Sequence, residues 1–264
     1  LLIIRLILVN YKGVDFGHPL CFIYICKMQI IKKITLILLC FVAISSHRGE
    51  SVDFVTYTLD NGEQLIITED MLLGKGIDIK DGRWVLCNKN RYLLAEVHKA
   101  FYMMKEAAAK DGVEIDVRSG LRDFQWQKDI WNWKWSLEER ASLNDKDRAL
   151  DILKYSSMPG TSRHHWGTDV DINSLELAYW ESEEGVKVYN WLVENGSKFG
   201  FFQPFKHSEN MGYLEEKWHW SYSPLANYYY DAYLKLIDYK DIKGFKGAYL
   251  AEELDVINRW IKIY

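Results

Sequence analysis

The stretch around which the chain is organised covers ten residues and reads Ser162-Arg163-His164-His165-Trp166-Gly167-Thr168-Asp169-Val170-Asp171. It places an imidazole at His164 and a carboxylate seven residues later at Asp171. Residues 168–172 alternate polar and apolar, which predicts a short β-strand with Asp169 and Asp171 on one face. Gly167, just before this strand, permits a tight backbone turn. The pattern indicates a candidate metal site.

A second stretch, Glu216-Lys217-Trp218-His219-Trp220, supplies another carboxylate and another imidazole. Two His and one Asp form a typical ligand set for catalytic zinc, because they leave a fourth position open for water. The additional Glu could act as a general base. Glu216 and His219 are three residues apart, so a flat strand would point them to opposite faces. Both can reach one metal only if the chain turns or bulges at Lys217-Trp218, and we predict such a break.

The composition is that of one domain of ordinary size with extensions. The chain has 264 residues, of which 48% are hydrophobic, and this is enough for a substantial core. The formal net charge is −4, and no block rich in Lys and Arg occurs, which argues against a nucleic-acid partner. We expect a monomer.

The N-terminal segment has the pattern of a secretory signal peptide. A basic pair, Lys32 and Lys33, precedes an apolar run that ends in small residues. We interpret residues 28–46 as the signal peptide and residues 1–27 as upstream, non-native sequence translated in frame. The mature protein is then expected in the periplasm or cell envelope, without a stable membrane span. An N-terminal membrane anchor is the alternative, although the apolar run is short for one.

Loss of the leader would leave an acidic domain with a single cysteine. Residues 1–46 carry +4 of the net charge of −4, so −8 remains. Three of the four cysteines lie in this segment, and only Cys87 follows it. The mature domain is therefore expected to have no intrachain disulfide and to be held together by burial.

Hydrophobic periodicity predicts a mixed order of helices and strands. The predicted helices cover residues 91–110, 123–135, 136–154, 183–195, 225–237 and 248–262. The predicted strands are a hairpin within 51–70 and single strands at 113–117, 168–172, 200–202 and 213–222. Residues 71–90 are rich in Gly and are predicted as loop. This order favours an α+β fold, a small antiparallel sheet flanked by helices, with a C-terminal helical extension.

Three motifs, at residues 119–127, 162–171 and 216–220, resemble those of a known enzyme family. The central stretch resembles the signature Ser-x-His-x-x-Gly-x-Ala-x-Asp of the LAS zinc peptidases, which include the VanY-type D-alanyl-D-alanine carboxypeptidases (peptidase family M15). The downstream stretch resembles the Glu-x-Trp-His motif of that family. The segment Ser119-Gly120-Leu121-Arg122, followed by Gln127, resembles its Ser-Gly-Tyr-Arg segment. The motifs occur in the order of the family, and the resemblance covers roughly residues 85–228.

The resemblance implies a role for each matching position. His164, Asp171 and His219 would bind Zn²⁺, and Glu216 would be the general base. Arg122 would hold negative charge on the substrate, either a terminal carboxylate or the oxyanion of the tetrahedral intermediate. The residues that would position the peptide are Ser119, Ser162 and Gln127.

The sequence departs from the family signature at Asp169, where the family has Ala. We interpret Asp169 as a hydrogen-bond acceptor that orients a ligand His. Direct approach to the metal and contact with a cationic part of the substrate are the alternatives. His165 is a second candidate ligand, but the spacing to Asp171 favours His164. Arg163 either lines the substrate groove or packs in the interior, and the sequence does not choose between these.

These observations divide the chain into five segments. They are the upstream sequence 1–27, the signal peptide 28–46, an N-terminal hairpin and loop 47–84, a zinc peptidase domain 85–228 and a helical extension 229–264. The implied function is a zinc-dependent D-alanyl-D-alanine carboxypeptidase acting on peptidoglycan stem peptides. An LD-carboxypeptidase or a peptidoglycan endopeptidase with the same zinc chemistry is one alternative. A non-catalytic peptidoglycan-binding module is another.

Overall fold

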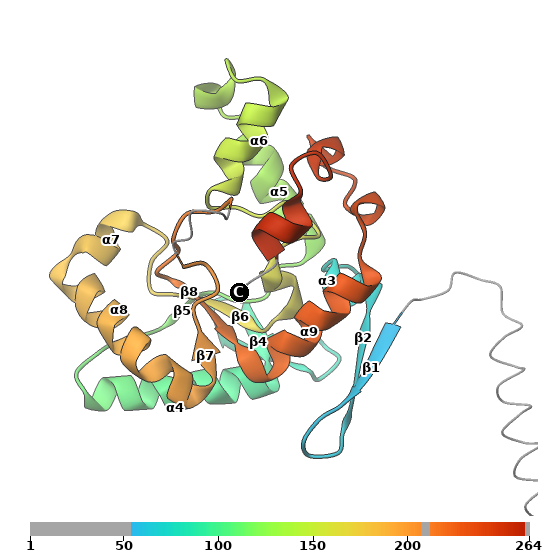
Figure 1. Cartoon of the computed structure of the whole chain (residues 1–264). Coiled ribbons are helices and arrows are strands. Elements are labelled where there is room, and N and C mark those ends of the chain that lie inside the picture. Colours follow the sequence, from blue (N-terminus) through green and yellow to red (C-terminus); the bar gives the residue numbers. More distant parts are fainter. Residues whose placement is uncertain (1–53, 207–211, 262–264) are drawn as a thin grey trace, which may run out of the picture. The chain divides into compact units, whose positions relative to one another are not determined.

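A four-stranded antiparallel sheet lies at the centre of the fold and contains both predicted site stretches. The computed structural model describes residues 54–206 and 212–261, and the segments interpreted as signal peptide and upstream sequence lie outside this range. The strand order is β5–β6–β8–β7. The strands are β5 (Val117–Ser119), β6 (Asp169–Ile172), β8 (His219–Tyr222) and β7 (Phe201–Phe202). The two stretches that carry the candidate site therefore form the two central strands (Figure 1).

Helices flank this sheet and confirm the predicted α+β class (Figure 1). The helices are α3 (Glu69–Leu72), α4 (Ala95–Lys110), α5 (Phe124–Trp135), α6 (Asp145–Leu153), α7 (Leu177–Glu181), α8 (Glu183–Asn195) and α9 (Ser223–Leu236). Helix α4 buries the apolar stripe that its sequence predicts, at Val97, Phe101, Met104 and Ala108. Helix α9 begins at Ser223, two residues before its predicted start, with Pro224 in the first turn and Tyr222 at the N-cap position.

The first hairpin is confirmed around Asn61-Gly62. It consists of β1 (Phe54–Thr58) and β2 (Gln64–Thr68), which pair antiparallel. The hydroxyl of Tyr57 donates a hydrogen bond to Asp231 of α9 over 2.5 Å. This contact attaches the hairpin to the C-terminal half of the domain.

A second hairpin corrects the prediction of loop for residues 71–90. β3 (Trp84–Asn88) pairs with β4 (Arg91–Leu94). The turn residues Lys89 and Asn90 both have positive φ, as a two-residue hairpin turn requires. The helix predicted from residue 91 therefore begins at Ala95, because the preceding four residues belong to β4.

Three other predictions are corrected, two at strand boundaries and one by the division of a helix. β5 covers Val117–Ser119 instead of 113–117, and β8 begins only at His219. The helix predicted at 136–154 is divided into a 3-10 turn and α6. Asn144 causes this division, since its side chain caps α6 by accepting a hydrogen bond from the N–H of Asp147.

The single helix predicted at 248–262 is wrong. The described part of this segment forms a 3-10 turn at Ala248–Leu250 and a π-helical turn at Ile257–Ile261. Asp255 lies between them with a φ of 55°, a left-handed conformation that interrupts a helix. The segment packs on α6, because Trp260 Nε1 donates a hydrogen bond to the carbonyl of Leu153 over 2.9 Å.

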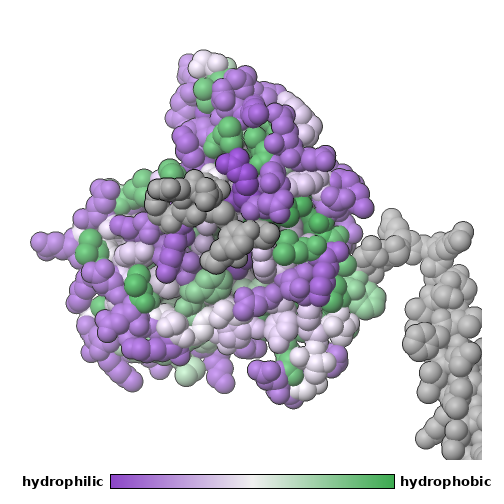
Figure 2. Space-filling view, viewed as in Figure 1, coloured by the Kyte–Doolittle hydropathy of each residue, from purple (hydrophilic) through white to green (hydrophobic). Residues whose placement is uncertain are grey.

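The surface visible in Figure 2 is mainly hydrophilic, and its apolar residues form small, separate patches. Scattered exposed apolar side chains of this kind are ordinary for folded domains. Among the residues that the structure describes, no helix is both long and apolar enough to cross a bilayer.

Substitution of Gly167 should destabilise the domain more than its backbone conformation alone explains. Gly167 joins the 3-10 turn Arg163–Trp166 to β6 at a φ of +70°, and an added Cβ would lie 2.3 Å from the ring of Trp84. We expect Gly167→Ala to lower the free energy of unfolding, measured in urea, by more than the ~1–2 kcal/mol cost of a left-handed L-residue. Gly62→Ala is the matched control, since Gly62 has a φ of +84° and no heavy atom within 4 Å. Equal losses in the two variants would contradict the contact with Trp84.

Candidate metal centre

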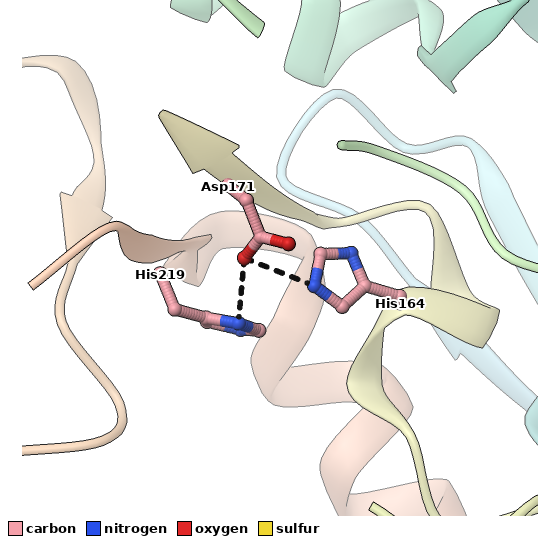
Figure 3. A group of neighbouring side chains, drawn as sticks. All are labelled: His164, Asp171 and His219. Carbon is pink, nitrogen blue, oxygen red and sulfur yellow. Dashed lines mark hydrogen bonds and ion pairs between the residues drawn. The ribbon is translucent and has the colours of Figure 1, made fainter. Parts of the chain in front are cut away.

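Three potential metal ligands converge at the middle of the sheet (Figure 3). Asp171 lies on β6 directly opposite His219, the first residue of β8. His164 comes from the 3-10 turn that precedes β6. One ligand-type atom from each side chain lies within 4.8 Å of the other two, and all three side chains are buried. The structure therefore brings together the three residues to which the sequence assigned metal binding.

One carboxylate oxygen faces both imidazoles. Asp171 Oδ1 is 3.2 Å from His164 Nε2 and 3.2 Å from His219 Nδ1. The two rings are nearly perpendicular, at 77°, with their centroids 4.7 Å apart. Figure 3 shows both rings presenting a nitrogen edge to the carboxylate. Such convergence of donor atoms is what a single small cation requires.

The outer ring nitrogens of the two imidazoles contact oxygen atoms that can only accept. His164 Nδ1 lies 2.8 Å from the carbonyl oxygen of Gly120, and His219 Nε2 lies 2.8 Å from Asp169 Oδ2. Each of these nitrogens must therefore carry the proton and donate it. The inner nitrogens, His164 Nε2 and His219 Nδ1, are then left with lone pairs that a metal can use. Two neutral imidazoles and a carboxylate match the ligands that zinc prefers.

The charges of the cluster follow from burial and from its internal contacts. Burial and the nearby Arg122 lower the pKa of His164 to about 4, so this ring is neutral at neutral pH. Burial opposes charge on His219 as well, but its hydrogen bonds to Asp169 and Asp171 raise its pKa to about 9. Without a metal, Nδ1 of His219 therefore carries a second proton at neutral pH, and a metal would have to displace that proton to use the Nδ1 lone pair. Burial alone would raise the pKa of Asp171, yet His164 and His219 hold it below the usual range. Asp171 is therefore an ionised carboxylate, as metal binding needs.

Glu216 reaches the same site from outside β8. The chain turns at Lys217-Trp218 before the strand begins at His219, so the predicted break is confirmed. Glu216 Oε2 lies 3.5 Å from His219 Nδ1, and Gln203 Nε2 donates a hydrogen bond to the Glu216 carbonyl over 3.0 Å. Burial raises the pKa of Glu216 to about 7. A buried carboxyl that titrates near neutral pH is suited to proton transfer.

Arg122 borders the cluster on the loop between β5 and α5. Its Nη2 is 3.5 Å from Asp171 Oδ2, and its Nη1 donates to Gln127 Oε1 over 3.0 Å. Its buried Nε has no hydrogen-bond partner among the described residues. Gln127 in turn donates to the carbonyl of Ser157 over 2.7 Å. The guanidinium is thus held in place beside Asp171, with one buried N–H unpaired among the described residues.

The two serines predicted to contact substrate are also beside the cluster. Ser119 lies opposite Asp171 in the pairing of β5 with β6, and Ser162 precedes His164 by two residues. Both side chains are buried, with 7% and 3% of their surface exposed. Their substrate contacts remain predictions.

His165 is outside the cluster, as the spacing argument expected. Its Nδ1 donates to the carbonyl of Arg122 over 2.7 Å, and its Nε2 accepts from the N–H of Gly160 over 3.0 Å. Burial lowers the pKa of His165 to about 3. The neutral ring therefore supports the loop that carries Arg122.

Lys134 is a charged group near the site that the sequence reading missed. It follows Gln127 by seven residues and so lies on the same face of α5. Its ammonium donates to Ser156 Oγ over 3.1 Å. Burial and, secondly, the charge of Arg122 lower the pKa of Lys134. The seven-residue spacing from Gln127 was the available signal.

Comparisons with known proteins match the region that contains this site. The family model VanY, described as D-alanyl-D-alanine carboxypeptidase, matches residues 90–225. A D-alanyl-D-alanine carboxypeptidase of Enterococcus faecalis is 33% identical over 119 residues, which are 44% of this chain and 43% of that protein. YodJ of Bacillus subtilis is 30% identical over 142 residues, which are 51% of this chain and 47% of that protein. The chain thus spans less than half the length of these two curated relatives.

A solved structure with a similar fold is that of the vancomycin-resistance D,D-pentapeptidase VanY in complex with Zn(II). It is 26% identical to this chain, with a TM-score of 0.47. The similarity covers 56% of this chain and 83% of that one.

The raised pKa of Glu216 should make the stability of chelator-treated protein depend on pH. Between pH 4.5 and about 7, Glu216 keeps its proton in the folded state but has lost it in the unfolded state. The free energy of unfolding therefore falls as the pH rises through this range. Relative to Glu216→Gln, which cannot ionise, wild type should lose at most about 3 kcal/mol across this window. Urea unfolding at a series of pH values measures the difference.

The half-buried neighbour Glu215, which accepts a hydrogen bond from the Tyr189 hydroxyl, provides the control for this substitution. Glu215→Gln leaves Glu216 in place, so the decrease that Glu216 causes should remain. If the free energies of unfolding of wild type and Glu216→Gln differ by the same amount at every pH, the burial of an ionisable group at this position is contradicted.

Proposed function

This chain belongs to the VanY family of D-alanyl-D-alanine carboxypeptidases, and we propose that it is a zinc-dependent enzyme that removes the terminal D-Ala from peptidoglycan stem peptides. The observation that carries this proposal is the convergence of His164, Asp171 and His219, with Glu216 Oε2 3.5 Å from His219 Nδ1. All four residues lie within the segment that matches the family, 90–225. A non-catalytic binding module would need neither the carboxyl of Glu216 nor its placement.

Zinc fits the side chains that are present. His164 Nε2, His219 Nδ1 and the Asp171 carboxylate would hold it, because their remaining contacts leave lone pairs for a cation. Bound zinc would supply a Lewis acid for the scissile carbonyl and would lower the pKa of the attacking water. Three protein ligands are typical of catalytic zinc sites, whereas structural sites are closed by four.

Glu216 would move the proton that hydrolysis requires. Its carboxylate would accept a proton from the attacking water as the water oxygen bonds to the peptide carbonyl carbon. It would then give this proton to the nitrogen of the terminal residue as the C–N bond breaks. The carboxyl group thus returns to its starting state after each turnover.

Arg122 would hold negative charge on the peptide. Its Nε is buried without a partner among the described residues, and its Nη1 is oriented by Gln127. A guanidinium binds a terminal carboxylate in a forked geometry and can also donate to a developing oxyanion. Ser119, Ser162 and Gln127 would position the peptide around it.

The proposal includes export to the periplasm or cell envelope. It is supported by the basic pair Lys32-Lys33 and the apolar run after it, in a segment outside the described residues. Stem peptides of the assembled cell wall lie outside the cytoplasm, so an enzyme that cuts them there has to be exported.

Incubation with purified muropeptides tests this function. Zinc-loaded protein should release terminal D-Ala, as mass spectrometry of the products would detect. Removal of zinc with a chelator should abolish the release, and added zinc should restore it. Release of a terminal residue through an L,D peptide bond would instead identify an LD-carboxypeptidase. Cleavage inside the cross-link would identify an endopeptidase.

Glu216→Gln should lower kcat by about a hundredfold or more, because it removes the general base. It should leave one zinc per chain, measured by elemental analysis, since Glu216 is not among the three ligands. Glu215→Gln, one residue earlier and outside the cluster, should keep wild-type kcat. Activity that survives both chelation and Glu216→Gln would exclude the proposed mechanism.

The role of Arg122 can be separated by steady-state kinetics. If it binds the terminal carboxylate in the ground state, Arg122→Met should raise KM more than it lowers kcat. If it stabilises the oxyanion, kcat should fall with little change in KM. A peptide amide that lacks the terminal carboxylate provides the matched substrate, and wild-type rates on it would contradict carboxylate binding.

A further inference from the structure

Asp169 lies behind the candidate metal centre, at the position where the family signature resembled by this sequence has Ala. Its side chain is fully buried. Asp169 Oδ2 accepts from Arg163 Nε and from His219 Nε2, each over 2.8 Å. Asp169 Oδ1 accepts from Thr168 Oγ1 over 2.7 Å and from Ser221 Oγ over 2.8 Å. Four donors therefore surround one buried carboxylate.

The register of the sheet places Asp169 and Asp171 on either side of one imidazole. Asp169 pairs with Ser221 and Asp171 pairs with His219 across β6 and β8. Asp169 contacts Nε2 of His219, and Asp171 lies 3.2 Å from Nδ1 of the same ring. The ring is thus bounded at both nitrogens by carboxylates of one strand.

Arg163 supplies the charge that a buried carboxylate needs. Only 2% of its surface is exposed, and an isolated carboxylate at such depth would be costly. Besides its bond to Asp169, the guanidinium donates from Nη2 to Ser221 Oγ over 2.7 Å. It lies 4.6 Å from the ring centre of Trp166. These contacts hold Arg163 in the interior, where its buried side chain also borders a cavity beside Phe202 and Trp220.

The contacts of Asp169 argue against its two other roles, as a metal ligand and as a binding group for a cationic part of the substrate. Both carboxylate oxygens already accept two hydrogen bonds each, so neither is free for a metal. Since the side chain has no exposed surface, it also cannot meet a cationic part of a substrate.

We propose that Asp169, held in place by Arg163, is a positioning residue that fixes the proton of His219 on Nε2 and aims Nδ1 at the metal. The inference rests on the proposed zinc site and deepens it. A carboxylate behind a ligand imidazole sets the tautomer and the orientation of the ring and raises its basicity. An Ala at this position offers no hydrogen-bond acceptor. In this chain the Asp169–Arg163 pair therefore sets the tautomer and the orientation of the His219 ring.

Zinc affinity tests the proposal without recourse to activity. Competition with a chromophoric chelator should give a zinc dissociation constant about 10- to 100-fold higher for Asp169→Asn than for wild type, as is usual when the partner of a ligand is lost. Asp169→Ala alone would leave the Arg163 charge buried and unpaired and could unfold the protein. The double variant Arg163→Met with Asp169→Ala removes both charges and should weaken zinc binding to a similar extent.

Thr168→Val is the matched control. It removes one hydrogen bond to Asp169 Oδ1 and leaves the contacts of Oδ2 with Arg163 and His219 intact. Its zinc affinity should stay close to that of wild type. If it weakens zinc binding as much as Asp169→Asn does, the effect is general to the buried network and the proposal is overturned.

Nitrogen NMR of the zinc-loaded protein provides a direct signature. In wild type, His219 should show a protonated Nε2 whose hydrogen exchanges slowly, and in the double variant this hydrogen should exchange fast. Unchanged affinity and an unchanged Nε2–H signal in a folded double variant would overturn the inference. If wild type fails to bind zinc, both this inference and the proposed function are overturned. If wild type binds zinc but does not hydrolyse muropeptides, only the proposed peptidase activity is overturned.

Discussion

The pairing of β6 with β8 is the constraint on which the site depends. Its register sets Asp171 opposite His219 and Asp169 opposite Ser221. A slip by one residue would turn every side chain of the strand to the other face. That other face carries Val170 and Trp220, which are 0% and 3% exposed and belong to the hydrophobic core. The burial of these two residues therefore fixes the same register that brings the metal ligands together. A change that alters the packing of this core face would also displace the metal ligands.

Much of the site was predictable because its signals are local. The alternation of residues 168–172 placed Asp169 and Asp171 on one face, and both indeed contact His219. The three-residue spacing of Glu216 and His219 required a break in the strand, and the chain turns between them. The α+β class followed from the order of periodic segments. In each case neighbours in sequence determined the geometry, so no knowledge of tertiary contacts was needed.

The parts that sequence reasoning missed depend on contacts between distant residues. The apolar run of β3 has no alternation to mark it as a strand, and its turn at Lys89-Asn90 lacks the Gly that usually identifies such hairpins. The role of Arg163 was undecided, because an arginine in a groove and an arginine paired in the interior have the same sequence. Only the fold shows that its partners are Asp169 and, 58 residues away, Ser221. Likewise, the apolar spacing of the C-terminal segment predicted one helix, whereas Asp255 adopts a left-handed conformation within it.

The support of Arg122 extends beyond the segment that defines the family. His165 binds its carbonyl, and the N–H of Phe124, two residues on, donates to the carbonyl of Gly74 over 2.7 Å. Farther along α5, Trp131 Nε1 donates to the carbonyl of Lys246 over 2.8 Å. Gly74 and Lys246 lie on either side of the matched residues 90–225. Substitutions in these flanking segments can therefore shift the backbone that carries Arg122 while every motif residue stays the same, so the placement of this guanidinium depends on residues that the family model does not cover.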